Sequence, residues 1–223
     1  MKNIIRPTWI SLAFSMILFP NTLLSATQAE EYKTISLPNG VSIELSNNWG
    51  PLLNNERVTL DNYVKLFIES TGQKNQSSEL PFAANYYGEN GSVIGILNLR
   101  YYPQQELSQS DAQKMTDQEV NLLDTTLKNG IHIGLKKSKL TLVSWKGTTK
   151  EKINGITVFL TEYYRSSSIS KSNFRVRLIR VFAKDKSFTL TISYLKTAEM
   201  LLEPITDRII GSLKFTPDTK RKN

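Results

Sequence analysis

Two closely spaced arginines offer the clearest chemistry in this sequence. Arg175 and Arg177 alternate with apolar residues, a pattern typical of a strand that presents both guanidinium groups on one face. The next apolar stretch carries a row of hydroxyls at the same spacing, which comprises Thr189, Thr191 and Ser193. If the two strands pair, we predict that the arginines lie beside this row. Since guanidinium binds carboxylate and phosphate in a bidentate manner, we expect the face to bind an acidic protein partner; an ordinary solvated face is the alternative.

The sequence offers little for catalysis. It has one histidine and no cysteine, whereas a zinc site needs several such ligands. His132 stands between apolar residues with no nucleophile at a fixed spacing, and neither a calcium loop nor a glycine-rich phosphate loop is present. We therefore predict no metal, no cofactor and no enzymatic activity. A hydrolase built on paired carboxylates is the alternative, with Asp61, Glu89 and Glu162 as candidate members.

The first 29 residues resemble a secretory signal peptide. Lys2 and Arg6 precede a largely apolar run over residues 10–24, and Thr27 and Ala29 fit the small-x-small rule for cleavage before Glu30. The run is shorter than the roughly 20 residues that span a bilayer, and without cysteine a lipidated start and a disulfide scaffold are both excluded. We predict a cleaved signal peptide at 1–29, a single domain at 30–215 and a basic flexible tail at 216–223.

The charge balance favours acidic partners. The formal net charge of +8 falls to +6 without Lys2 and Arg6. A positive surface attracts acidic proteins or anionic membranes, although plain solubility is the simpler explanation. An exported chain without a recognisable nucleic-acid motif is not expected to bind nucleic acid.

Period-two alternation and turn residues predict a sheet-rich domain. Residues 35–37 and 41–45 flank Pro38-Asn39-Gly40 and predict a hairpin. A second hairpin is predicted over residues 82–102, and its second strand is apolar on both faces, as in the centre of a sheet. The other predicted strands cover residues 140–146, 156–165, 174–183 and 188–195.

Helical periodicity predicts three helices. Thr59 or Asp61 caps a short helix that follows a polar loop over residues 47–55 and ends before Gly72. The longest helix begins with a Ser110–Gln113 capping box and ends at Asn129-Gly130, which leaves His132 in a linker. A last helix covers residues 201–213, with Pro204 in its first turn. The residues at helical spacing in the longest helix are Ala112, Met115, Glu119, Leu122, Leu123 and Leu127.

Three Tyr-Tyr pairs lie on predicted strands, at residues 86–87, 101–102 and 163–164. Because neighbouring strand residues point to opposite faces, we expect at least one ring of each pair to be buried.

This order of elements resembles the PsbP-like fold family over residues 35–215. Three stretches carry the resemblance: Leu37-Pro38-Asn39-Gly40-Val41-Ser42-Ile43 with Trp49 after it, Ile153-Asn154-Gly155-Ile156 leading into Tyr163-Tyr164, and the closing Ile210-Gly211-Ser212-Leu213-Lys214-Phe215. The resemblance implies an α+β fold, an antiparallel sheet packed by helices as an α/β/α sandwich, used mainly as a binding or adaptor module. The family has no shared catalytic set, so it implies no functional residue.

These features together predict an exported, periplasmic or secreted, non-enzymatic protein that acts through protein–protein contact. A more specific expectation is an immunity or inhibitor protein that covers a secreted toxin. The alternative is a carrier of a small amphiphilic ligand in a pocket between helix and sheet. A large apolar cavity would favour the carrier, and a solid core under the helix over residues 112–127 would argue against it.

Overall fold

The computed structural model describes residues 30–70, 79–103, 107–166, 171–183 and 186–216, with the backbone alone for residues 63–70. The predicted signal peptide and all of the predicted tail except Thr216 lie outside these residues. By internal contacts the chain divides into Met1–Glu30 and Glu31–Asn223, and all helices and strands described belong to the second unit. Among the described residues, no helix combines the length and apolar character that a bilayer crossing requires.

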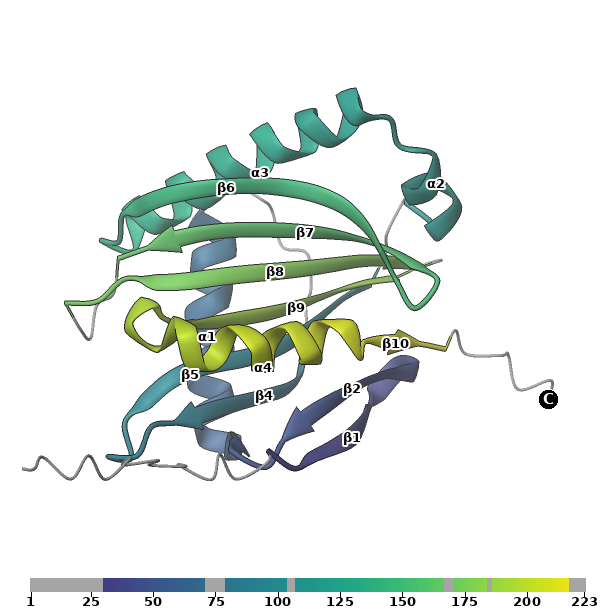
Figure 1. The fold of residues 1–223 in the computed structure, drawn as a ribbon. Helices are drawn as coiled ribbons and strands as arrows, with labels where there is room; N and C mark the ends of the chain where they lie inside the picture. The colour runs from purple at the N-terminus through teal and green to yellow at the C-terminus, as the bar shows by residue number, and fades with distance from the viewer. Residues whose placement is uncertain (1–29, 71–78, 104–106, 167–170, 184–185, 217–223) are drawn as a thin grey trace, which may run out of the picture. The chain divides into compact units, whose positions relative to one another are not determined.

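Seven antiparallel strands form the main sheet, in the order β3-β4-β5-β9-β8-β7-β6 (Figure 1). Their bounds are Trp49–Pro51 for β3, Glu79–Tyr87 for β4, Val93–Pro103 for β5, Leu142–Ile153 for β6, Ile156–Arg165 for β7, Phe174–Ala183 for β8 and Lys186–Leu195 for β9. The central position predicted for the second strand of the 82–102 hairpin is confirmed, because β5 pairs with β4 on one side and β9 on the other.

A second, three-stranded sheet contains β1 (Tyr32–Leu37), β2 (Val41–Ser46) and β10 (Lys214–Phe215). The predicted opening hairpin is therefore confirmed, and its turn is a 3₁₀ element over Pro38–Gly40. Gly40 has a φ of +76°, and a Cβ atom there would lie 2.0 Å from the carbonyl oxygen of Thr216. Only glycine fits this turn while the chain after β10 passes so close.

Helices cover both faces of the main sheet, which confirms the α+β sandwich. Figure 1 shows α4 in front of the sheet and α1 behind it. The bounds are Asn54–Ser70 for α1, Gln109–Lys114 for α2, Asp117–Lys137 for α3 and Glu199–Gly211 for α4.

The main hydrophobic core lies between the sheet and α4. Leu202, Ile205 and Ile209 of α4 pack in one buried cluster with apolar residues of β4, β5, β7, β8 and β9. Two smaller clusters lie on the other face. One joins Ile131 and Leu135 of α3 to β7 and β8, and the other joins α2 and the start of α3 to Phe159 and Phe182.

The predicted long helix is wrong in both its start and its end. Two helices replace it, and each begins with a capping box: Ser108 with Asp111, and Thr116 with Glu119. The second continues through Asn129-Gly130 to Lys137. Burial of Ile131 and Leu135 outweighs the cost of about 1 kcal/mol for a mid-helix glycine. His132 therefore lies on α3, exposed, and not in a linker.

Three other boundaries differ from expectation. The first predicted helix begins at Asn54, and a Glu56 carboxylate accepts the Leu53 N–H, so neither Thr59 nor Asp61 is its cap. The expected loop over residues 47–55 contains β3, because buried Trp49 packs edge-on against Tyr86. The strand expected at residues 140–146 begins at Leu142 and continues to Ile153 as β6, because residues 147–153 pair in regular register with β7.

Pro204 lies inside α4, at its sixth residue, and not in the first turn. Proline has no N–H, so Pro204 cannot donate to the carbonyl of Met200, four residues earlier. Met200 is 96% exposed. Water can therefore satisfy this carbonyl.

The three Tyr-Tyr pairs follow the expected rule. Tyr86, Tyr101 and Tyr163 are buried, whereas their partners Tyr87, Tyr102 and Tyr164 keep partial or full exposure.

The packing of α4 against the sheet should contribute much of the free energy of unfolding. Leu202 is 0% exposed and packs closely on β5: a Cβ atom added at Gly95 would lie only 3.3 Å from Leu202 Cδ1. We expect Leu202→Ala to lower the free energy of unfolding by about 2–5 kcal/mol in urea titrations. Met200→Ala, at a residue 96% exposed on the same helix, should change it by less than about 0.5 kcal/mol. Similar losses for both variants would contradict this packing.

Candidate interaction site

Arg175 and Arg177 lie on the face of β8 that α4 covers. Residues directly opposite each other in antiparallel strands share a face, and Arg175 lies opposite Tyr194 while Arg177 lies opposite Ile192. The hydroxyl row lies on the other face, since Ser193, Thr191 and Thr189 lie opposite Val176, Leu178 and Arg180. The prediction that the two arginines lie beside the hydroxyl row is therefore wrong. Alternation within each strand did not fix the register between them.

The two arginines are held in a network of carboxylates. Arg175 Nη1 donates to Glu199 Oε1 at 2.8 Å and also to Glu203, and its Nη2 lies 3.3 Å from Glu162 Oε2. Arg177 Nε pairs with Glu162 Oε1 at 2.6 Å, and Arg177 Nη1 donates to Asp207 and Thr206. Three of the four carboxylates belong to α4, so the network fastens that helix to the sheet.

The network leaves little positive charge for a partner. The Arg175 and Arg177 side chains are only 13% and 9% exposed, and four carboxylates surround them. Breaking such a pair from one side typically costs about 3–5 kcal/mol, because the remaining charges stay desolvated. A structural role thus accounts for both arginines, and their predicted contact with an acidic partner stays a prediction.

Ionisation in this network is tuned by burial and hydrogen bonding. Burial alone would lower the pKa of the Arg175 guanidinium, but its hydrogen bond to Glu203 and the surrounding negative charges raise it. Burial and a 2.6 Å hydrogen bond to Glu199 raise the pKa of Tyr164 to about 12. Burial opposes ionisation of Glu199, but hydrogen bonds from Tyr164 and Arg175 outweigh it and lower the pKa of this carboxyl.

The candidate catalytic carboxylates do not converge. Glu162 pairs with the arginines on the α4 side, whereas Asp61 of α1 lies 2.9 Å from Arg100 Nη1 on the opposite side of the sheet. Glu89 is exposed in the turn between β4 and β5. Within the described ranges, no group of three His, Cys, Asp or Glu is placed to hold a metal ion.

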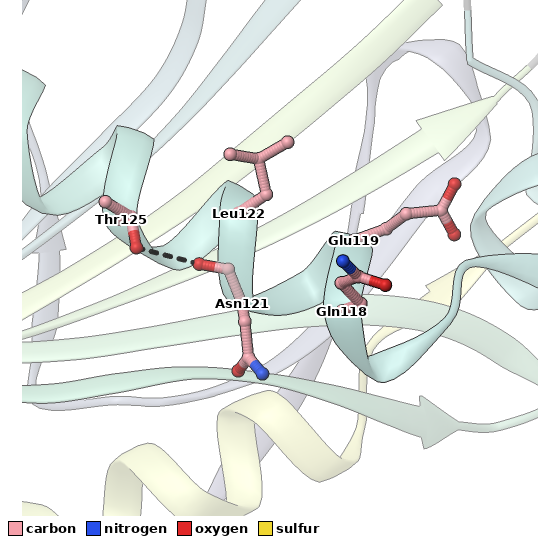
Figure 2. A pocket seen from close by; sticks show the side chains of 5 residues that line it. All are labelled: Gln118, Glu119, Asn121, Leu122 and Thr125. Carbon is pink, nitrogen blue, oxygen red and sulfur yellow. Dashed lines mark hydrogen bonds between the residues drawn. The ribbon is translucent and has the colours of Figure 1, made fainter.

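The outer side of α3 carries a solvent-facing depression of about 430 Å³. Figure 2 shows its lining residues on the first turns of the helix, where the Thr125 hydroxyl donates to the Asn121 carbonyl at 3.0 Å. Leu122 lies among them with 68% of its surface exposed, and Ile133, three turns further along, is 44% exposed. The lining residues are Gln118, Glu119, Asn121, Leu122 and Thr125.

We call the stripe through Leu122, Thr125, Asn129, Ile133 and Lys136 the α3 outer face. These residues recur at intervals of three and four, and all are exposed. The sequence did not reveal this face. Leu122 has the spacing of a core residue, but the register of α3 turns Val120 and Leu123 inward instead.

The fold is found in known proteins. No protein-family model matches the chain, and no curated protein matches its sequence. The solution structure of cyanobacterial PsbP (CyanoP) from Synechocystis sp. PCC 6803 is similar, with a TM-score of 0.50 at 9% identity over 88% of this chain and 99% of that one.

Two further solved structures are similar at TM-scores below 0.5. LpqN, involved in cell envelope biogenesis of Mycobacterium tuberculosis, has a TM-score of 0.45 at 10% identity over 85% of this chain and 92% of its own. The Ran-binding protein Mog1p of Saccharomyces cerevisiae has a TM-score of 0.44 at 7% identity over 85% of this chain and 97% of its own. The likeness to cyanobacterial PsbP shows that the chain has the PsbP-like fold, and at 9% identity it defines the fold alone.

The arginine network makes stability depend on pH in a defined direction. The pKa of Glu199 is lowered in the folded state, below the unfolded value of about 4.3. The stabilisation from its ionised form is therefore complete above that value and is lost as the pH falls through the folded pKa. We expect the urea midpoint to fall on acidification from about pH 5 to about pH 3, and to fall less steeply in Glu199→Gln.

A matched control is available on β6. Glu151 is exposed and accepts only a local hydrogen bond from Thr149, so Glu151→Gln should keep the wild-type pH dependence. If Glu199→Gln followed the same acid profile as the wild type, Glu199 would not be part of a stabilising network.

Proposed function

We propose that this protein is a non-enzymatic binding protein that acts through protein–protein contact at the α3 outer face. The exposed Leu122 beside an open depression is the observation that carries the proposal. A partner's side chain can bury Leu122 there and be oriented by the surrounding amide and hydroxyl groups. Protein interfaces gain most of their energy from a few such apolar anchors within a polar rim.

Charge supports an acidic partner. Lys136 lies in the α3 outer face, and Lys139 follows directly after the helix, both exposed. The carboxylates of the α4 side, in contrast, outnumber the two arginines that they surround. An acidic partner would therefore be attracted to the end of α3 more than to the predicted arginine row.

The absence of enzymatic activity is part of the proposal. A carboxylate acting as a general acid needs a raised pKa, whereas hydrogen bonds lower the pKa of Asp111, Glu119 and Glu199. Asp61 and Glu162 already serve as partners of buried arginines on opposite faces. These observations support a binding role over a hydrolase.

The carrier alternative has less support under α3. Ala112 and Val120 pack in one cluster with Phe159 and Phe182, where a carrier would need a ligand cavity. α2 and the start of α3 therefore stand over packed side chains. An immunity or inhibitor protein is a more specific form of the binding proposal, with the α3 outer face covering part of its target.

Export is proposed from the N-terminal pattern of the sequence. The protein recovered from the envelope of a bacterium that expresses the full chain should have the mass of a chain that begins at Glu30. A product that keeps residues 1–29, or one that stays in the cytoplasm, would contradict cleavage and export.

The binding surface is tested by a charge placed at its apolar centre. In affinity capture from the native envelope, we expect the wild type to retain one dominant protein. We expect the affinity for that protein to fall by at least about thirtyfold in Leu122→Glu. This decrease corresponds to the loss of about 2 kcal/mol that is typical of a central anchor.

Leu201→Glu is the control, because Leu201 is similarly exposed, at 51%, on α4. It should bind as the wild type does, and both variants should keep the wild-type urea midpoint. Equal retention by Leu122→Glu, or no retained protein at all, would contradict the proposed function.

A further inference from the structure

We propose that the sheet face beneath α1 holds a second site, which binds an oxyanion such as the phosphate or carboxylate group of a small ligand. We call it the polar floor and define it by Arg180, Thr189, Thr191, Ser193 and Asn98. The site is independent of the α3 outer face and does not rest on the proposed protein contact.

The register of three central strands assembles the polar floor. Arg180 of β8 lies opposite Thr189 of β9, and Thr189 lies opposite Arg100 of β5. Neighbouring strands are about 4.8 Å apart, so the two arginine backbones lie about 10 Å apart with the threonine between them. Both guanidinium stems are long enough to reach an anion that sits over Thr189. Thr191 and Asn98 lie opposite each other two residues along the same face.

Among the described residues, the two arginines on this face differ in their counter-ions. Arg100 pairs with Asp61 at 2.9 Å. Arg180 forms no hydrogen bond and no ion pair in the part of the chain that the structure describes. Burial lowers the pKa of its guanidinium, and the nearby Tyr102 opposes this shift only in part. Partial burial removes water from this cation without supplying a counter-ion, and a bound anion would offset that cost.

A second polar group on the floor lacks a partner. Thr189 is 6% exposed, and its buried Oγ1 has no hydrogen bond to any residue that the structure describes. Buried hydroxyls are nearly always hydrogen-bonded, so such an atom beside an uncompensated guanidinium points to a missing acceptor. An oxyanion would accept from both groups.

The polar floor is less tightly covered than the α4 face. Arg180, Thr191 and Leu178 keep partial exposure, although they lie on central strands. Their neighbours on the α4 face, Ile179, Leu190 and Ile192, are all 0% exposed. A small ligand can therefore reach the floor from solvent, whereas the α4 face is closed.

Inorganic phosphate is the first probe. In thermal unfolding at constant ionic strength, we expect the midpoint of the wild-type protein to rise with phosphate and then saturate. Arg180→Gln should weaken the apparent affinity by at least about tenfold, and Thr189→Val should weaken it by removing the hydroxyl donor. Arg208→Gln is the matched control, because Arg208 is an exposed arginine paired with Glu44 and should leave the phosphate response unchanged.

Parallel titrations with acetate and with a soluble short-chain phosphatidate distinguish the source of the oxyanion. A saturable response to any of the three probes that is lost in Arg180→Gln supports the site and names its chemistry. A non-saturating rise that is equal in wild type and Arg180→Gln is general salt exclusion and would overturn the proposal. So would the absence of any response.

Discussion

The pairing register of β8 with β9 is the constraint on which the rest of the structure depends. It places Arg175 and Arg177 on the same face as Tyr194 and Ile192, and the hydroxyl row on the face of Arg180. A shift of one residue would exchange the two sets and put the apolar core on the wrong side. The register holds because the α4 face buries Ile179, Leu190 and Ile192 completely. Each side of the sheet then acquires a distinct chemistry.

The α4 side is closed both by packing and by charge. Leu202 and Ile209 fill the apolar part of the interface, and the arginine network fastens the solvent-facing part of the helix. Four carboxylates surround the two guanidinium groups of this network, so both guanidinium groups have counter-ions. The opposite side is less complete among the described residues. Arg180 forms no hydrogen bond or ion pair there, the Thr189 hydroxyl has no hydrogen bond, and Leu122 of the α3 outer face is exposed. The proposed protein contact and the proposed oxyanion site therefore both lie on the side of α1 and α3.

Much of the fold was predictable from the alternation of apolar and polar residues and from turn residues. Less of the candidate site was predictable. The strands β7 and β8 have the bounds predicted for them, because each is a run of apolar and β-branched residues that ends at loop residues. The end of α3 was missed because a local glycine signal was outweighed by the burial of Ile131 and Leu135, which depends on distant strands. The arginine row was assigned to the wrong face because spacing within a strand does not determine register. Arg180 carried a usable signal, since it has the opposite parity to Arg175 and Arg177 and so had to face the other way.

The central claim is that the two sets of arginines differ, with Arg175 and Arg177 structural and Arg180 available to a ligand. The NMR signals of the arginine Nε–Hε groups, recorded with and without phosphate, test it most directly. The account predicts that the Arg175 and Arg177 signals keep their positions and resist solvent exchange while the Arg180 signal moves with saturation. Movement of the Arg175 and Arg177 signals, with Arg180 unchanged, would contradict the assignment of the two faces.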